Sequence, residues 1–281
     1  MAEGNALKAM VSFFTIWQRD ITEEDMEAMN RRFHLVPLVG TLIGIVVLVV
    51  AAVLVGLNQK GIFGSAMFTA IAVLAVVYVG SRFLHFDGLT DFGDGSVVAG
   101  TQEDHVRALK DTLVGAGGLG VATVAALMSF SLYTMAGVMI MAFAAATEVL
   151  VKNAQVAAAA YGQAGNGMAG RQVSETTVRS MQVSTLISVV PSIVLAVVGA
   201  FLAQKMMEWG LPSWASVDMD YVAVVIAVVV GLLVSVLTGY LMAKRCNRVF
   251  GMVNGDILGA TNEISRIAVM ASMILVYGLV V

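Results

Sequence analysis

The chain is poor in the residues that stabilise or mark a soluble domain. Its 281 residues include one cysteine, three prolines and three histidines, and only 12% of them are charged. A lone cysteine, Cys246, excludes an intrachain disulfide and a multi-cysteine metal cluster. The formal net charge is only −3 and no long basic run occurs, which argues against nucleic acid as a partner.

What the chain has in excess is apolar sequence. Hydrophobic residues make up 59% of it, and its mean hydropathy of +0.88 lies far above that of a soluble domain. Because lipid offers no partner to backbone polar groups, apolar segments of this length cross a bilayer as helices. The sequence therefore predicts an all-α polytopic integral membrane protein with about seven transmembrane helices. The predicted spans are residues 36–57, 62–80, 113–130, 132–151, 181–202, 221–243 and 257–281.

One boundary in this assignment is weak. Only Ser131 and poor turn residues separate the third span from the fourth. Residues 113–151 therefore form either a pair of helices or a re-entrant element. The seven spans are otherwise separated by clearly polar loops.

Basic side chains collect on one side of these spans. They occur in the N-terminal segment and in the loops after the second, fourth and sixth spans, whereas the other side has only Lys60 and Lys205, with Lys152 near the end of a span. The positive-inside rule then predicts a multi-pass cell-membrane protein whose N-terminus and polar motifs are cytoplasmic and whose C-terminus is outside. Residues 1–35 form an interfacial segment, in which 22–25 predicts the capped start of a surface or linker helix.

Asp87, Asp91 and Asp94 form a regular acidic stripe directly after the second span. At positions i, i+4 and i+7 of a helix, these carboxylates stay within an arc of about 60° and repel one another unless a cation lies between them. Oxygen ligands suit Mg²⁺, which keeps waters that a phosphorylated substrate can replace. The neighbouring glycines let a ligand or another backbone come close. We predict Mg²⁺ binding by these three residues; the alternative is a solvated acidic loop.

A second acidic stripe opens the last span. Asp256 and Glu263 are again seven residues apart, and Asn254 and Asn262 lie beside them. Acids in a helix bundle usually have a function, so we expect this stripe to belong to a functional site. The alternative is a packing face, because Gly259 between the two acids favours close helix contact.

Cations border both stripes. Arg82 precedes the first stripe and Lys110 follows it, while Lys244 and Arg248 precede the second. Cations beside acids and a metal indicate a phosphate-bearing substrate, since phosphoryl transfer depends on positioning and charge neutralisation. The positive-inside rule explains the same cations as topogenic charges.

Among the histidines, His85 alone borders the acidic stripe, which makes it a candidate base or phosphate donor. We expect the other two histidines to be bystanders. Asn166 lies in a glycine-rich loop on the predicted cytoplasmic side and is expected to shape the mouth of the substrate site. Glu148 and Lys152 stand one turn apart in the fourth span, where they either pair or mark a site.

At this point the chain resembles a known family. The run His85–Gly95 resembles the His-Leu-Asp-Gly-Leu-Ala-Asp-x-x-Asp-Gly signature of cobalamin synthase, adenosylcobinamide-GDP ribazoletransferase. Three further stretches agree in order, at residues 33–44, at Lys110-Asp111 with 115–118, and at 251–263. The resemblance covers nearly the whole chain, and its first and last motifs are specific.

The resemblance implies a Mg²⁺-dependent membrane transferase of phosphorus-containing groups. Such an enzyme joins α-ribazole or its phosphate to adenosylcobinamide-GDP, giving adenosylcobalamin or its phosphate and GMP. The first stripe would hold Mg²⁺ on the diphosphate, and the catalytic set would be His85, Lys110, Asp256 and Glu263. Substrate would contact Arg82, Asp111, Asn166, Lys244, Arg248, Asn254 and Asn262. Residues 1–281 would form one transmembrane catalytic domain, with formation of a homo-oligomer left open.

The chain departs from the family at two places. Many members have Arg-x-Pro where this chain has Phe14–Trp17, and Ser-Arg where it has Thr147-Glu148.

Two other functions compete with the one that the resemblance implies. A CDP-alcohol phosphotransferase would need Asp-Gly-x-x-Ala-Arg between its acids, which Thr90–Phe92 does not supply, and a cation-coupled transporter would need acids near the middle of the membrane.

Overall fold

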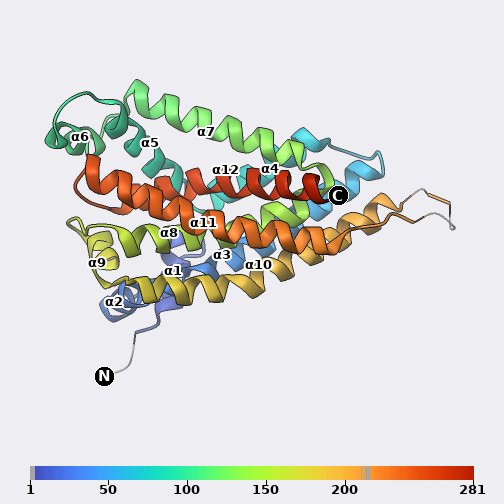
Figure 1. Cartoon of the computed structure of the whole chain (residues 1–281), viewed down its shortest axis with the longest axis horizontal. Coiled ribbons are helices and arrows are strands. Elements are labelled where there is room, and N and C mark those ends of the chain that lie inside the picture. Colours follow the sequence, from blue (N-terminus) through green and yellow to red (C-terminus); the bar gives the residue numbers. More distant parts are fainter. Residues whose placement is uncertain (1–3, 210, 213–215) are drawn as a thin grey trace.

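The computed structural model describes residues 4–209, 211–212 and 216–281, and in this part of the chain the regular structure is helical (Figure 1). The first helices are α1 (Ala6–Phe14), α2 (Glu23–Arg31), the 3-10 turn η1 (Phe33–Leu35), α3 (Val36–Gln59), α4 (Ala66–Gly80), α5 (Leu84–Val97), α6 (Gln102–Leu109) and α7 (Ala116–Met135). The others are η2 (Gly137–Met139), α8 (Ile140–Tyr161), α9 (Met168–Glu175), α10 (Val178–Met207), α11 (Tyr221–Val249) and α12 (Gly255–Val280).

The predicted all-α membrane architecture is confirmed. Six helices of the described residues are long and apolar enough to cross a membrane, and a seventh span results if the bent pair α4 and α5 is counted as one. Residues 113–151 are a pair of helices, α7 and α8, joined by η2. The break lies at 136–139 and not at Ser131, because the apolar sequence runs on across Ser131 and hydropathy alone does not mark the turn.

A sharp bend separates α4 from α5 and sets the direction of the acidic motif. The two helices meet at 89°, and the residues between them include Arg82 and Phe83, both with positive φ, at 54° and 56°. Left-handed backbone is strained in residues other than glycine. The Arg82 guanidinium donates to the Phe13 carbonyl oxygen at 2.8 Å, and the Phe83 ring stacks on Tyr78 with centroids 6.1 Å apart. These contacts hold α5 across the end of the bundle.

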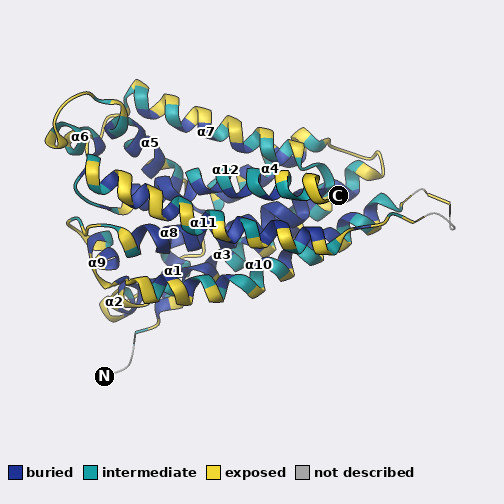
Figure 2. Cartoon of the chain, in the orientation of Figure 1, coloured by how far each residue is buried: buried dark blue, intermediate teal, exposed yellow. Residues whose placement is uncertain are grey.

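Helix α8 forms the centre of the bundle, and every residue from Ile140 to Ala159 is buried (Figure 2). Its neighbours α3, α10 and α11 approach it through glycines. A β-carbon built on Gly44 of α3 would lie 2.5 Å from the Ala145 carbonyl oxygen, and one on Gly239 of α11 would lie 2.3 Å from that of Ala154. Small residues permit such close backbone contact between membrane helices, where van der Waals packing drives association.

The N-terminal helices α1 and α2 pack together at the same end of the bundle as α5, α6 and α9, while the C-terminus lies at the other end (Figure 1). The predicted capped start is present, because Thr22 and Asp25 form a reciprocal capping box. Asp25 also accepts hydrogen bonds from the Asn5 backbone N–H at 2.6 Å and the Lys8 ammonium at 2.9 Å. These bonds, the Asn5 bond first, lower the pKa of Asp25 to about 2, so its carboxylate stays ionised and ties α1 to α2.

The glycine contacts of α8 lead to a prediction about stability. We expect Gly44→Ala to destabilise the protein by about 1–3 kcal/mol, because the added methyl group meets a backbone oxygen that cannot move cheaply. Thermal unfolding of the detergent-purified protein measures the loss. Gly120→Ala on α7 is the matched control: no atom lies within 4 Å of its β-carbon position, and alanine favours a helix. Equal melting temperatures for both variants would contradict the packing argument.

Candidate active site

A pocket of about 200 Å³ with apolar and polar walls lies where α5 and α12 meet the N-terminal helices. It contains residues of both predicted acidic stripes. Its walls come from α1, η1, α5, α8, α9 and the start of α12. The lining residues are Phe13, Phe14, Phe33, Leu84, His85, Asp87, Gln155, Met168, Ala169, Gln172, Gly255, Asp256, Leu258 and Gly259.

Two glycines bring the acidic stripes together. A β-carbon on Gly88 of α5 would lie 2.8 Å from the backbone oxygen of Asp256, and one on Gly259 of α12 would lie 3.3 Å from the His85 α-carbon. The two backbones therefore touch, and Asp87 and Asp256 line the same pocket from opposite helices. Glycine in the acidic motif serves the approach of a neighbouring backbone, one of the two uses expected from the sequence.

Asp91 adds a third carboxylate to this pair. It lies one turn after Asp87 and is partly exposed, and the charges that act on it most strongly are those of Asp256, Asp87 and Asp94, in that order. Within the part of the chain that the structure describes, no three His, Cys, Asp or Glu side chains are already arranged to hold a metal ion. The acids share one region, but their oxygens do not form a closed coordination shell.

Asp94 has a clear structural task. One of its carboxylate oxygens accepts from the Gly115 N–H and the other from the Gly118 N–H, both at 2.7 Å. Backbone N–H groups at a helix start lack partners within the helix and favour a negative charge. Asp94 thus holds the start of α7 against α5, and its predicted part in metal binding stays a prediction.

The predicted cations and amides lie at this end of the bundle but differ in what they contact. Lys110 at the end of α6 acts electrostatically on the Asp256 carboxylate, whereas Arg82 bonds the Phe13 carbonyl oxygen. Asn254 caps α12 and donates to Asp256 at 2.8 Å. The Asp111 carboxylate accepts from the Leu113 N–H, and Asn166, Lys244 and Arg248 have exposed side chains.

His85 forms the inner wall of the pocket and begins a chain of buried polar groups. Its Nε2 lies 2.5 Å from the Lys152 Nζ, which also donates to the Asn262 Oδ1 at 2.8 Å. The Phe14 ring stacks on the imidazole with centroids 5.8 Å apart. The ring of His85 is therefore fixed on two sides before any substrate binds.

The chain continues from Asn262 into the centre of the bundle. Asn262 donates to Glu263 at 2.9 Å, and Arg266 bonds both Glu263 and Glu148 and donates to the Tyr133 hydroxyl at 3.2 Å. All these side chains are at most 2% exposed. Glu263 thus lies behind the pocket wall and does not line the pocket.

Sequence reasoning missed the partners in this network. Arg266 lies inside the last predicted span and received no role from the sequence, yet it neutralises two buried glutamates. Glu148 bonds Arg266, and Lys152 bonds His85 and Asn262, so the bonded partners of the i, i+4 pair are on other helices. One sequence feature could have pointed to these residues, because ionisable residues inside apolar segments are rare and almost always paired or functional.

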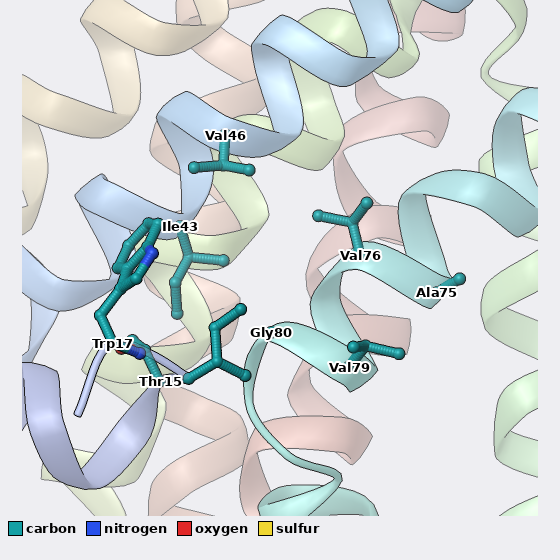
Figure 3. A pocket seen from close by; sticks show the side chains of 9 residues that line it. Thr15, Trp17, Ile43, Val46, Ala75, Val76, Val79 and Gly80 are labelled. Atoms are coloured by element: carbon teal, nitrogen blue, oxygen red, sulfur yellow. The ribbon is translucent and has the colours of Figure 1, made fainter.

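An apolar pocket of about 380 Å³ lies apart from these polar groups, between the segment after α1 and helices α3 and α4. Trp17, Ile43 and Val46 face Val76 and Val79 across it (Figure 3). It presents no charged side chain. It therefore offers no charged partner to a phosphate-bearing ligand.

The helical bundle with a carboxylate-lined pocket at one end of its helices defines a multi-pass membrane enzyme. A family model described as Cobalamin-5-phosphate synthase matches residues 6–274. The chain belongs to this family, whose members are transferases of cobalamin biosynthesis. No solved structure matches it significantly.

Relatives of nearly full length carry the name adenosylcobinamide-GDP ribazoletransferase. The protein of Methanocella arvoryzae is 28% identical over 96% of this chain and 95% of its own length. Those of Halorubrum lacusprofundi and Prosthecochloris aestuarii are 28% and 27% identical, over 94% and 93% of this chain and 95% and 94% of their own lengths. The similarity therefore extends over the whole bundle and is not confined to the acidic motif.

The network around Arg266 leads to a second prediction about stability. Arg266→Met should destabilise the protein by about 3–5 kcal/mol, because it leaves Glu148 and Glu263 buried without a cation. Thermal unfolding in detergent measures the effect. Lys205→Met removes an exposed pair with Glu208 and should leave the melting temperature nearly unchanged. The assignment is wrong if the two variants unfold alike.

The contacts of Asp94 separate its structural part from a part in metal binding. We expect Asp94→Asn to lower stability by about 0.5–2 kcal/mol, the range for losing a carboxylate at a helix start, while the Mg²⁺ concentration that half-saturates activity stays within twofold. Unfolding curves and Mg²⁺ titrations of activity provide the two readouts. A stable variant with a much weaker Mg²⁺ response would instead identify Asp94 as a metal ligand.

Proposed function

We propose that the chain is an adenosylcobinamide-GDP ribazoletransferase, which joins α-ribazole or its phosphate to adenosylcobinamide-GDP and releases GMP. Family membership and the printed names of the relatives support this activity. The observation that carries it at the level of residues is the meeting of Asp87 and Asp256 in one pocket, with Asp91 beside them.

Mg²⁺ is part of the proposal, and the donor set suits it. Asp87, Asp91 and Asp256 supply hard carboxylate oxygens from two helices whose backbones touch. These three repel one another, a repulsion that a divalent cation relieves. Mg²⁺ commonly retains waters, which substrate oxygens can replace. When bound, Mg²⁺ supplies charge neutralisation for the diphosphate and the departing GMP.

The residues around the acids have separate tasks in the proposed reaction. A ribazole hydroxyl forms the new phosphorus–oxygen bond to the phosphate that carries cobinamide, and the bond from that phosphorus to GMP breaks. Lys110 lies near Asp256 and would offset phosphate charge, with Arg82, Lys244 and Arg248 at the same end of the bundle. His85 lines the same pocket as Asp87 and Asp256, and its Nε2 is paired with Lys152.

We also propose that the site faces the cytoplasm, with the N-terminus on the same side and the C-terminus outside. The basic residues of the loops gather at the end of the bundle that carries α2, α5, α6 and α9 (Figure 1), which the positive-inside rule assigns to the cytoplasm. Soluble, charged nucleotide substrates reach the pocket from that side.

The transporter alternative does not suit the buried charges. The acids at depth in the bundle are Glu148 and Glu263, and Arg266 already neutralises both. A coupling cation would have to replace a guanidinium that makes several hydrogen bonds. The pocket acids, in contrast, lie in the first turns of α5 and α12.

The proposed function predicts a selective loss of activity. Detergent-purified protein given Mg²⁺, adenosylcobinamide-GDP and α-ribazole should release GMP, and chelation of Mg²⁺ should stop the release. Asp87→Asn should lower kcat at least about 100-fold through loss of charge stabilisation in the transition state, with little change in melting temperature, because the Asp87 side chain is exposed.

The matched control is Asp218→Asn, an exposed aspartate just before α11 at the opposite end of the bundle, which should keep wild-type activity. Full Mg²⁺-dependent GMP release by correctly inserted Asp87→Asn protein would contradict the role given to this carboxylate. Absence of GMP release from the wild-type protein would contradict the proposed function itself.

A further inference from the structure

An apolar groove of about 810 Å³ lies between α10 and α11, away from the candidate active site. Leu186, Leu233 and Leu237 line it, and each of them is more than half exposed. Its volume lies in the range of roughly 300–1,000 Å³ that is common for ligand pockets. Because α10 and α11 are both long and apolar enough to cross a membrane, lipid chains in a bilayer lie directly against this groove.

One end of the groove is aromatic and polar. Tyr161 at the end of α8 and Tyr240 of α11 meet there edge to face, with ring centroids 5.0 Å apart. The exposed Gln182, near the start of α10, lines the same groove. Tyrosine is typical of the membrane–water interface, where its ring meets lipid and its hydroxyl meets water. Leu233 lies about two turns deeper on α11 than Tyr240, so the groove runs from head-group depth into the hydrocarbon.

Hydrogen bonds hold the aromatic end in shape before any ligand binds. The Asn247 side chain of α11 donates to the Tyr161 carbonyl oxygen at 2.9 Å and accepts from the Gln163 N–H at 2.8 Å. These bonds tie the end of α8 to α11, which carries the Tyr240 ring. A ligand that binds to a preorganised surface loses less of its binding free energy to ordering the protein.

A cation follows the groove on each of the two helices. Lys244 of α11 is seven residues after Leu237 and four after Tyr240, and Arg179 of α10 is seven residues before Leu186. Residues seven apart lie on nearly the same face of a helix, so both cations continue the rows that line the groove. Both have exposed side chains, and neither forms an ion pair with another described residue.

We propose that this groove binds an anionic membrane phospholipid, with an acyl chain along the leucine rows and the phosphate between Arg179 and Lys244. Basic pockets between transmembrane helices bind anionic head groups in this way, and the Gln182 amide offers a further donor at the same depth. The positive-inside rule explains cations at this end of the bundle, but not their alignment with an apolar groove. The proposal goes beyond the transferase activity, and it gives Lys244 a lipid partner in place of the substrate contact expected from the sequence.

Binding of defined lipids tests the site without catalysis. The whole protein, delipidated in detergent, should bind phosphatidylglycerol at least about fivefold more tightly than phosphatidylcholine with the same acyl chains, because one basic side chain near a head group adds about that factor. Mass spectrometry of the intact complexes measures both affinities. Arg179→Gln and Lys244→Gln should each weaken phosphatidylglycerol binding about fivefold and leave phosphatidylcholine binding within twofold. Leu237→Trp, which fills the groove, should weaken phosphatidylglycerol binding by at least about fivefold.

The matched controls make the same substitutions away from the groove. Arg19→Gln removes an exposed cation of the N-terminal segment, and Leu127→Trp enlarges an exposed side chain of α7. Both should bind phosphatidylglycerol like the wild type, and an equal loss in the controls would contradict a specific site.

Three other outcomes also overturn the proposal. Equal binding of the two lipids by the wild-type protein does so even if no variant folds. Displacement by glycerol 3-phosphate at the same concentration as intact phosphatidylglycerol would show that the cations bind a soluble phosphate without the groove. A change of oligomeric state in Leu237→Trp, with phosphatidylglycerol binding unchanged, would assign the groove to a second copy of this chain.

Discussion

The backbone contact between α5 and α12 is the constraint on which the site depends. Gly88 and Gly259 let the two helices touch, so that Asp87 and Asp256 meet in one pocket although they are far apart in the sequence. This contact requires α5 to lie across the end of the bundle, which the bend of 89° after α4 provides. A side chain at Gly88 would meet the Asp256 backbone oxygen at 2.8 Å and force the two helices to shift.

Charge balance explains how the interior tolerates the groups behind this site. Arg266 forms ion pairs with Glu148 and Glu263, and Lys152 bonds His85 and Asn262. Removing water from a charge is costly unless a partner and further hydrogen bonds replace it. The network meets this requirement with side chains from α5, α7, α8 and α12, and it thereby fixes the His85 ring at the inner wall of the pocket.

The pocket acids and the buried network divide the polar residues of the chain into two groups with different tasks. Those at the helix ends stay partly or fully accessible and repel one another, which suits the metal-binding role that we propose for them. The polar side chains buried inside the bundle form hydrogen bonds and ion pairs with one another. Asp94 shows that membership of a motif does not decide the group, since its carboxylate holds the start of α7.

The sequence by itself determined the helical membrane architecture, the acidic helix, the capped α2 and the end of the bundle that carries the polar motifs. These follow from hydropathy, local periodicity and charge, which act over a few residues. Only the tertiary structure decided the bend at Arg82 and Phe83, the bonds of Asp94 to α7, and the partners of Arg266 and Lys152. Each depends on contacts between helices remote in sequence, and local pattern has no means of pairing them.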